Sequence, residues 1–200
     1  MARSDSEFLT IGLFASRVSA VVAALKIVIE EHFSHGGLAL YEGALDLDSI
    51  YVGRPPAGGT HAKRVALFEP KNAPTTTAMV SNLEDGWMTM VNALAKRLPG
   101  THLLARTSVD DYPITDLEIW VEGQSVRYVR AMKEDPSWEF YQRGEPLVFE
   151  QPDCYEQRRI SQRFNRTILF ETLKRAGWPV ADEEFWRSDL PAWYAAERSA

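Results

Sequence analysis

The first two thirds of the chain contain the same pattern twice, and this repetition constrains the fold more than any other feature. Phe8–Phe14 predicts a strand that leads into a long apolar helix at Arg17–Phe33, and Thr75–Ser81 predicts a strand that leads into a second helix at Glu84–Leu98. Short apolar segments typical of strands follow each pair. Because each helix has one apolar stripe that a sheet face must cover, we expect both helices on the same face of one antiparallel sheet.

Alternating apolar residues and turn signals predict the remaining elements. A third helix is expected at Tyr155–Arg175, where Ile160, Phe164 and Ile168 recur with helical spacing. Further strands are expected at Leu38–Tyr41, Ile50–Val52, Val65–Glu69, Leu103–Thr107, Leu117–Val121, Val126–Ala131, Trp138–Tyr141 and Leu147–Phe149.

These elements predict an α+β protein with a mostly antiparallel sheet of six or more strands. The sheet would be built from two strand-helix-strand-strand units at about 7–70 and 74–132. A C-terminal hairpin, the third helix and an aromatic tail follow at 136–200, and they would pack at an edge or on the other face. No segment has the composition of a linker, so we expect one domain spanning 1–200.

The charge balance excludes a general nucleic-acid-binding protein. The net charge is −6, whereas such binding depends on a clustered excess of Lys and Arg. Residues 1–100 have 9 Lys and Arg against 10 Asp and Glu, and residues 101–200 have 13 against 18. The acidic second half is compatible with attraction to a basic partner, although plain solubility is the favoured interpretation.

Cysteine content and apolar segments suggest a cytoplasmic protein without a membrane span. Cys154 is the single cysteine, which excludes an internal disulfide and fits a reducing compartment. The apolar run that starts at Phe8 is interrupted by Arg17 and Lys26, and acidic residues precede it. No cofactor is expected, because the two glycine pairs lack the Lys and the Ser or Thr of a phosphate-binding loop.

An acidic cluster is the most enzyme-like feature of the sequence. Asp110, Asp111, Asp116 and Glu118 gather around the start of a predicted strand. Several carboxylates together can hold a divalent cation or share a proton. Their spacing matches no metal-binding loop, and Asp-Asp-Tyr-Pro is also ordinary turn chemistry, which is the favoured interpretation.

Arginines and aromatic residues provide the candidate binding residues. Arg159, Arg163 and Arg166 would share one face of the third helix, where they either contact an acidic group or pair internally with Glu139, Glu145, Glu150 and Glu156. Trp120 and Tyr128 would lie with Arg130 on whichever sheet face the first two helices leave uncovered. The third helix and the tail would cover that face in the alternative arrangement.

The sequence therefore favours a non-catalytic, acidic protein that binds another protein, for instance the neutralising partner of a basic toxin or nuclease. A protein-binding face would be rich in Trp, Tyr and Arg. The alternative is a metal-dependent enzyme or small-molecule binder that uses Asp110, Asp111, Asp116 and Glu118. Homo-oligomeric assembly through a sheet edge or aromatic face is compatible with both.

Overall fold

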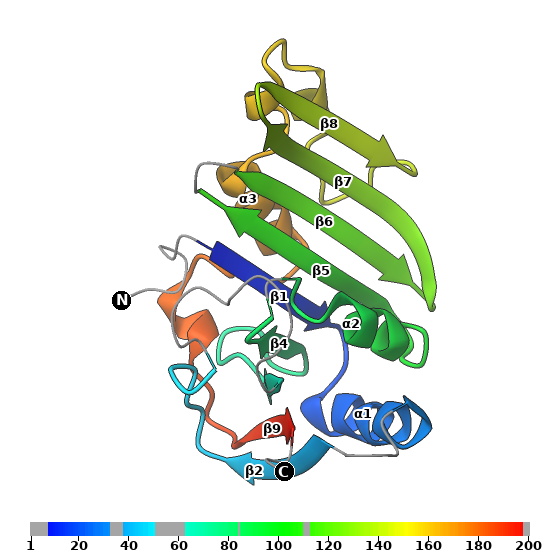
Figure 1. Ribbon diagram of the computed structural model, residues 1–200, viewed down its shortest axis with the longest axis vertical. Coiled ribbons are helices and arrows are strands. Elements are labelled where there is room, and N and C mark those ends of the chain that lie inside the picture. The colour runs from blue at the N-terminus through cyan, green and yellow to red at the C-terminus, as the bar shows by residue number, and fades with distance from the viewer. Residues whose placement is uncertain (1–7, 33–37, 51–62, 84, 110–112, 198–200) are drawn as a thin grey trace.

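A computed structural model of the 200-residue chain describes residues 8–32, 38–50, 63–83, 85–109 and 113–197. Its nine strands form one antiparallel sheet in the order β2-β9-β3-β4-β1-β5-β6-β7-β8 (Figure 1). The strands are β1 (Phe8–Phe14), β2 (Leu38–Gly43), β3 (Arg64–Phe68), β4 (Thr77–Ser81), β5 (Thr101–Ser108), β6 (Ile114–Val121), β7 (Gln124–Glu134), β8 (Ser137–Arg143) and β9 (Ala192–Glu197). The predicted α+β class and the predicted antiparallel sheet are confirmed.

Three α-helices accompany the sheet within the described residues. They are α1 (Val18–His32), α2 (Met88–Ala95) and α3 (Arg166–Arg175), and short 3-10 helices occur as η2 (Pro152–Glu156), η3 (Ile160–Gln162) and η4 (Glu183–Trp186). In Figure 1, α1 and α2 lie on the viewer's side of the sheet and α3 lies behind it. No helix in the described ranges is long and apolar enough to cross a membrane.

The alternation of side chains along β1 divides the hydrophobic core into two parts. Leu9, Ile11 and Leu13 join a cluster with Leu169 and Leu173 of α3. Phe14 belongs to the opposite cluster, which α1 and α2 complete. Gly12 also points to this side, where a Cβ would lie 3.1 Å from Val91 of α2, so the missing side chain allows α2 to approach the sheet closely. The prediction that the first two helices share one face is therefore correct.

The second helix is shorter than predicted. Gly86 and Trp87 have left-handed backbone angles, with φ of 65° and 59°, so the helix begins at Met88 rather than near Asn82. The side chain of Asn82 instead accepts a hydrogen bond from the backbone N–H of Arg64 (2.8 Å). A turn packed against β1 and β5 thus replaces the predicted first helical turns.

Two other predictions of local structure were wrong, and a third falls mostly outside the described residues. The continuous helix at Tyr155–Arg175 is divided into η2, η3 and α3. The predicted strand at Leu147–Phe149 is not a strand but leads into and forms part of a turn. Of the predicted strand at Ile50–Val52, Ile50 is in a turn and residues 51–52 lie outside the described range. In these segments the apolar spacing reflects burial against the sheet rather than a regular backbone.

The aromatic tail is more integrated into the fold than the sequence indicated. Trp178, Phe185 and Trp186 are buried in the cluster on the α3 side. Trp193 and Tyr194 belong to β9, which inserts between β2 and β3. Pairing with two strands from distant parts of the chain stabilises β9, and a local propensity argument does not detect such pairing.

Candidate binding face on strands β5 to β8

Apart from the end that α2 covers, the strands β5 to β8 have one face that no described helix covers. α3 contacts β5 and β6 from the other side, and η3 contacts β7 and β8, whereas α2 lies over one end of β5 (Figure 1). We call the uncovered side the open face. Strand pairing brings eight of its side chains together: Arg106, Asp116, Glu118, Ser125, Tyr128, Arg130, Tyr141 and Arg143.

A carboxylate lies between two arginines at the centre of the open face. Arg106 and Arg130 occupy the positions directly opposite Asp116 on the two neighbouring strands. Arg106 Nε donates a hydrogen bond to Asp116 Oδ2 at 3.0 Å, and a second guanidinium nitrogen also contacts this oxygen. Only 5% of Asp116 is exposed, and this burial raises its pKa, while the two arginines and a hydrogen bond from Tyr128 act in the opposite direction.

A second polar network lies toward the end of the face where β8 finishes. Ser125 Oγ donates to Glu118 at 2.7 Å and accepts from Arg143 at 2.6 Å. Arg143 also lies 3.7 Å from Glu118. Because these side chains fix one another, the face presents an ordered pattern of charges rather than freely rotating groups.

Two tyrosines complete the open face. The ring centroids of Tyr128 and Tyr141 are 5.9 Å apart, with the rings tilted by 52°. Tyr141 is 49% exposed, and Tyr128 is half-buried. Burial, and then the nearby Asp116 carboxylate, raise the pKa of Tyr128, so its hydroxyl keeps its proton and can donate a hydrogen bond.

The structure places the predicted aromatic residues differently. Tyr128 lies on the open face, as expected in the arrangement in which the third helix and the tail do not cover that face. Trp120 points to the same side of the sheet but is only 1% exposed, because it belongs to the buried cluster that α1 and α2 complete. The prediction of Trp120 as an accessible binding residue therefore fails, since α2 covers that end of β6.

The three predicted arginines of the third helix do not share a helical face. Arg159 precedes η3, Arg163 follows it, and Arg166 begins α3. The Arg163 guanidinium lies 5.5 Å from the Phe140 ring centroid and donates to the Gln157 carbonyl at 2.8 Å. Within the described ranges, no ion pair joins Arg159 or Arg163 to a carboxylate. They belong to the side of the sheet opposite the open face.

The acidic cluster divides in a similar way. Asp116 and Glu118 lie on the open face, where arginines engage both. Asp110 and Asp111 lie outside the described residues. Among the residues that the structure describes, no group of three or more His, Cys, Asp and Glu side chains is arranged to hold a metal ion.

Comparisons with known proteins do not place the chain in a family. No family model, curated protein or solved structure matches it. Its own geometry is thus the basis for inferring what it does.

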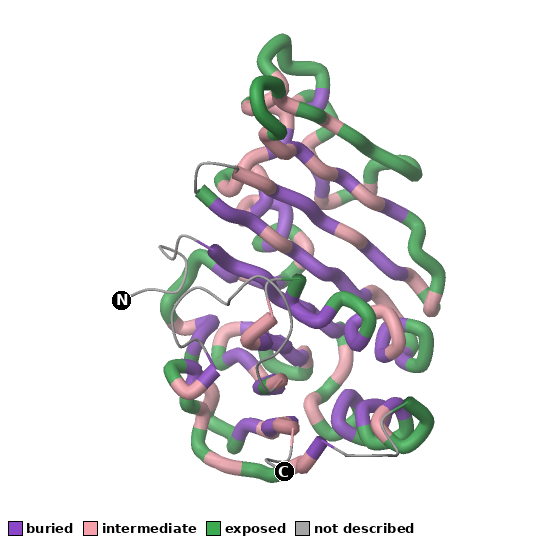
Figure 2. The backbone as a smooth tube through the Cα atoms, viewed as in Figure 1, coloured by how far each residue is buried: buried purple, intermediate pink, exposed green. Residues whose placement is uncertain are grey.

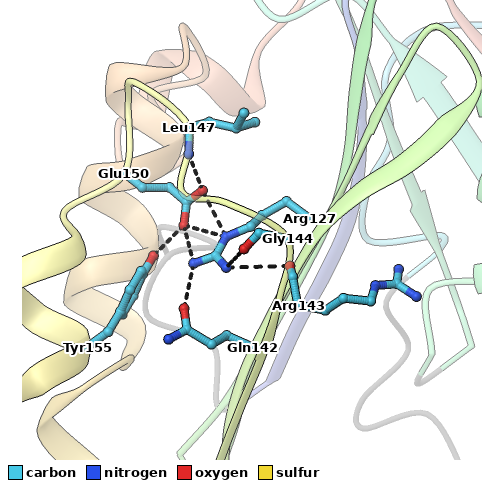
Figure 3. Close-up of polar contacts among 7 residues, drawn as sticks. All are labelled: Arg127, Gln142, Arg143, Gly144, Leu147, Glu150 and Tyr155. Atoms are coloured by element: carbon cyan, nitrogen blue, oxygen red, sulfur yellow. Dashed lines mark hydrogen bonds and ion pairs between the residues drawn. The ribbon is translucent and has the colours of Figure 1, made fainter.

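A buried charged cluster lies on the α3 side of the sheet, and no pattern in the sequence predicted it. Arg127 Nε donates to both carboxylate oxygens of Glu150, at 3.1 and 3.0 Å, and Tyr155 donates to the same carboxylate at 2.6 Å (Figure 3). The remaining guanidinium nitrogens donate to the Gly144 carbonyl and the Gln142 side chain. We call this group the arginine clamp. The Arg127 and Glu150 side chains have no exposed surface, so the clamp holds the segment after β8 rather than a ligand.

Proposed function

We propose that this chain is a non-catalytic protein that binds another protein through the open face. The observation that carries the proposal is the accessible Tyr141, surrounded by Tyr128, Arg130 and Arg143 on a rigid sheet. Tyrosine and arginine are enriched among residues that dominate binding energies, and preorganised side chains lose little entropy on binding.

The charge of the chain supports a basic partner. The net charge of −6 favours encounter with a positively charged protein. The end of the β7–β8 hairpin adds three exposed carboxylates, Glu134, Asp135 and Glu139. These carboxylates would lie at the rim of the interface, where they increase the association rate more than the affinity. A neutralising partner of a basic toxin or nuclease, acting in the cytoplasm, fits this surface.

The test compares two exposed tyrosines. Tyr141 on the open face and Tyr41 on β2 are 49% and 53% exposed, and each contacts another tyrosine ring. Tagged wild-type, Tyr141→Ala and Tyr41→Ala proteins would be used to capture partners from the host, with identification by mass spectrometry. Binding of a purified captured partner would then be titrated at two salt concentrations.

The expected result is one stoichiometric basic partner that binds wild type and Tyr41→Ala alike, with at least about a tenfold loss for Tyr141→Ala. Higher salt should weaken the binding. Equal binding by both variants would refute the open face as the interface. Capture of the chain alone would refute the protein-binding proposal as a whole.

We further propose that residues 7–70 and 74–132 are two copies of one strand-helix-strand-strand module within a single domain. The shared face of α1 and α2 supports this, as does the antiparallel pairing of the two leading strands, β1 and β4. The following strands take different places, because β5 pairs with β1 whereas β2 lies at the far edge. Stability of the two halves expressed separately would test whether either unit folds alone.

A further inference from the structure

The strand β8 forms one edge of the sheet, and its outer backbone is available. Its residues alternate between exposed and half-exposed along the first half and are all exposed from Tyr141 to Arg143. Within the described residues, the strand makes backbone hydrogen bonds to β7, and none joins its outer side to another segment. Figure 2 shows this edge in the colours of exposed and half-exposed residues. An edge of this kind is a template for another strand.

We propose that the chain forms a symmetric dimer in which β8 pairs with β8 of a second copy, centred on Tyr141. This proposal goes beyond the binding function above and concerns the outer backbone edge of β8, the strand that also contributes Tyr141 and Arg143 to the open face. Its occupant is a second copy of the chain, and the charge pattern of β8 is the reason.

The pleat restricts the register of such a pair. Residues directly opposite each other in an antiparallel pair point to the same side of the sheet. In β8, Glu139, Tyr141 and Arg143 point to the open face, whereas Phe140 packs on the other side. A register that places Phe140 of one copy opposite Tyr141 of the other would turn Phe140, which packs in the core, toward the open face. Such registers are therefore excluded.

Among the remaining registers, one matches opposite charges. Centring on Tyr141 places Glu139 of each copy opposite Arg143 of the other. Centring on Glu139 would place the Glu139 carboxylates of the two copies opposite each other. Centring on Gln142 would place Glu139 of one copy opposite Glu145 of the other, which is again a pair of carboxylates. Centring on Phe140 leaves Glu139 opposite Tyr141. Opposite charges across strands stabilise a pair and like charges destabilise it, so only the Tyr141 register gains two ion pairs.

The other edge of the sheet lacks this self-complementarity. β2 has one charged residue, Glu42, and no cation with which a second copy could pair it. Pairing of β8 with β2 of another copy would leave both outer edges free and propagate a fibre. The β8 pair closes after two copies. Its twofold axis is perpendicular to the sheet, so the two open faces would form one continuous surface.

Charge reversal tests the dimer directly. Glu139→Arg and Arg143→Glu should each place like charges opposite each other, and each should shift the protein from dimer to monomer in sedimentation equilibrium. Wild type should have about twice the 22.6 kDa mass of one chain. An equimolar mixture of the two variants should recover a one-to-one dimer, because a copy with two arginines then faces a copy with two glutamates.

The matched controls carry the same charge changes on α1 and the residue before it. Glu30→Arg and Arg17→Glu, both at exposed positions, should leave the dimer unchanged. Monomeric wild type at all concentrations, or failure of the mixed variants to associate, would overturn the proposal. A dimer that survives both Glu139→Arg and Arg143→Glu would also overturn the proposal, independently of whether the open face binds another protein.

A cross-link provides a readout that does not depend on affinity. In a Cys154→Ala background, Tyr141→Cys would face its own copy across the axis, at a separation that a disulfide can bridge. Oxidation by copper phenanthroline should therefore give a covalent dimer. Ser137→Cys is the control, because residue 137 would face residue 145 of the other copy. Equal cross-linking of both variants would contradict the register.

Discussion

Arg127 and Glu150 form an ion pair in which neither side chain has any exposed surface. Arg127 comes from β7 and Glu150 from the turn after β8, so the pair joins the sheet to the segment that covers its α3 side. Glu150 also accepts hydrogen bonds from Tyr155 and from the backbone of Leu147, which satisfies its oxygens. Burial and this carboxylate raise the pKa of Tyr155, whose hydroxyl therefore remains a donor.

Removal of one charge from the arginine clamp should strongly destabilise the fold. Arg127→Met leaves the Glu150 carboxylate buried without its cation, and we expect the free energy of unfolding to fall by about 3–5 kcal/mol. Urea denaturation would measure it. The control is Arg175→Met, which breaks an exposed pair with Glu171 and should cost at most about 0.5 kcal/mol.

The double variant Arg127→Met with Glu150→Gln distinguishes a buried charge from simple loss of packing. It should be less destabilised than the sum of the two single variants, because neither charge remains. Additive costs would mean that the pair contributes through volume alone.

Gly144 should be intolerant of any side chain. Its φ is 78°, and an added Cβ would overlap the Val126 carbonyl oxygen. Gly144→Ala should therefore lower the free energy of unfolding by more than about 2 kcal/mol, because backbone strain and a steric clash combine. Gly177 is the matched control: its φ is 97°, but a Cβ there would meet nothing within 4 Å. Equal costs in thermal or urea unfolding would show that the clash with Val126 is relieved by movement.

The sequence predicted strands β1 to β8 well, but it missed β9 and predicted the segments around Gly144 poorly. β1 was predicted with its observed bounds, because buried strands are long apolar runs bounded by turn residues. The arginine clamp was not predicted, because its members come from β7, β8, the segment after β8 and η2, and only the tertiary fold brings them together. The pattern did suggest Tyr128 as an open-face residue, but not that α2 covers Trp120, since helix placement over a sheet depends on contacts distant in sequence.

Stability should decrease in mildly acidic solution because of His102. This side chain is fully buried, its Nε2 hydrogen bonds to the Leu98 carbonyl at 3.0 Å, and its Nδ1 has no partner in the described part of the chain. Burial lowers its pKa below 6.5. Below about pH 6.5 the unfolded chain therefore binds a proton that the folded protein refuses, and stability is lost as the pH falls toward the folded value.

Urea titrations at about pH 7.5 and 5.5 would measure this effect in wild type and His102→Gln. The variant should be less stable at both pH values, but its stability should change less between them. The same pH dependence in both proteins would show that other groups are responsible.

The stabilisation that the Arg106–Asp116 pair provides should also decrease as the pH falls. Arg106→Met removes the closest cation from a carboxyl that is 5% exposed, so the free energy of unfolding should fall by about 2 kcal/mol at neutral pH. Burial already raises the pKa of Asp116, and the variant loses the opposing effect of Arg106. Asp116 therefore takes up a proton more readily in the folded variant. The difference in stability between wild type and variant should accordingly shrink as the pH falls toward the unfolded pKa of 3.8 and grow as the pH rises.

Urea unfolding across this pH range would measure the difference. The control combines Arg106→Met with Asp116→Asn, because the combined variant has no titrating carboxyl at position 116. A stability difference independent of pH would mean that the interactions with Arg130 and Tyr128 alone keep the Asp116 carboxylate charged.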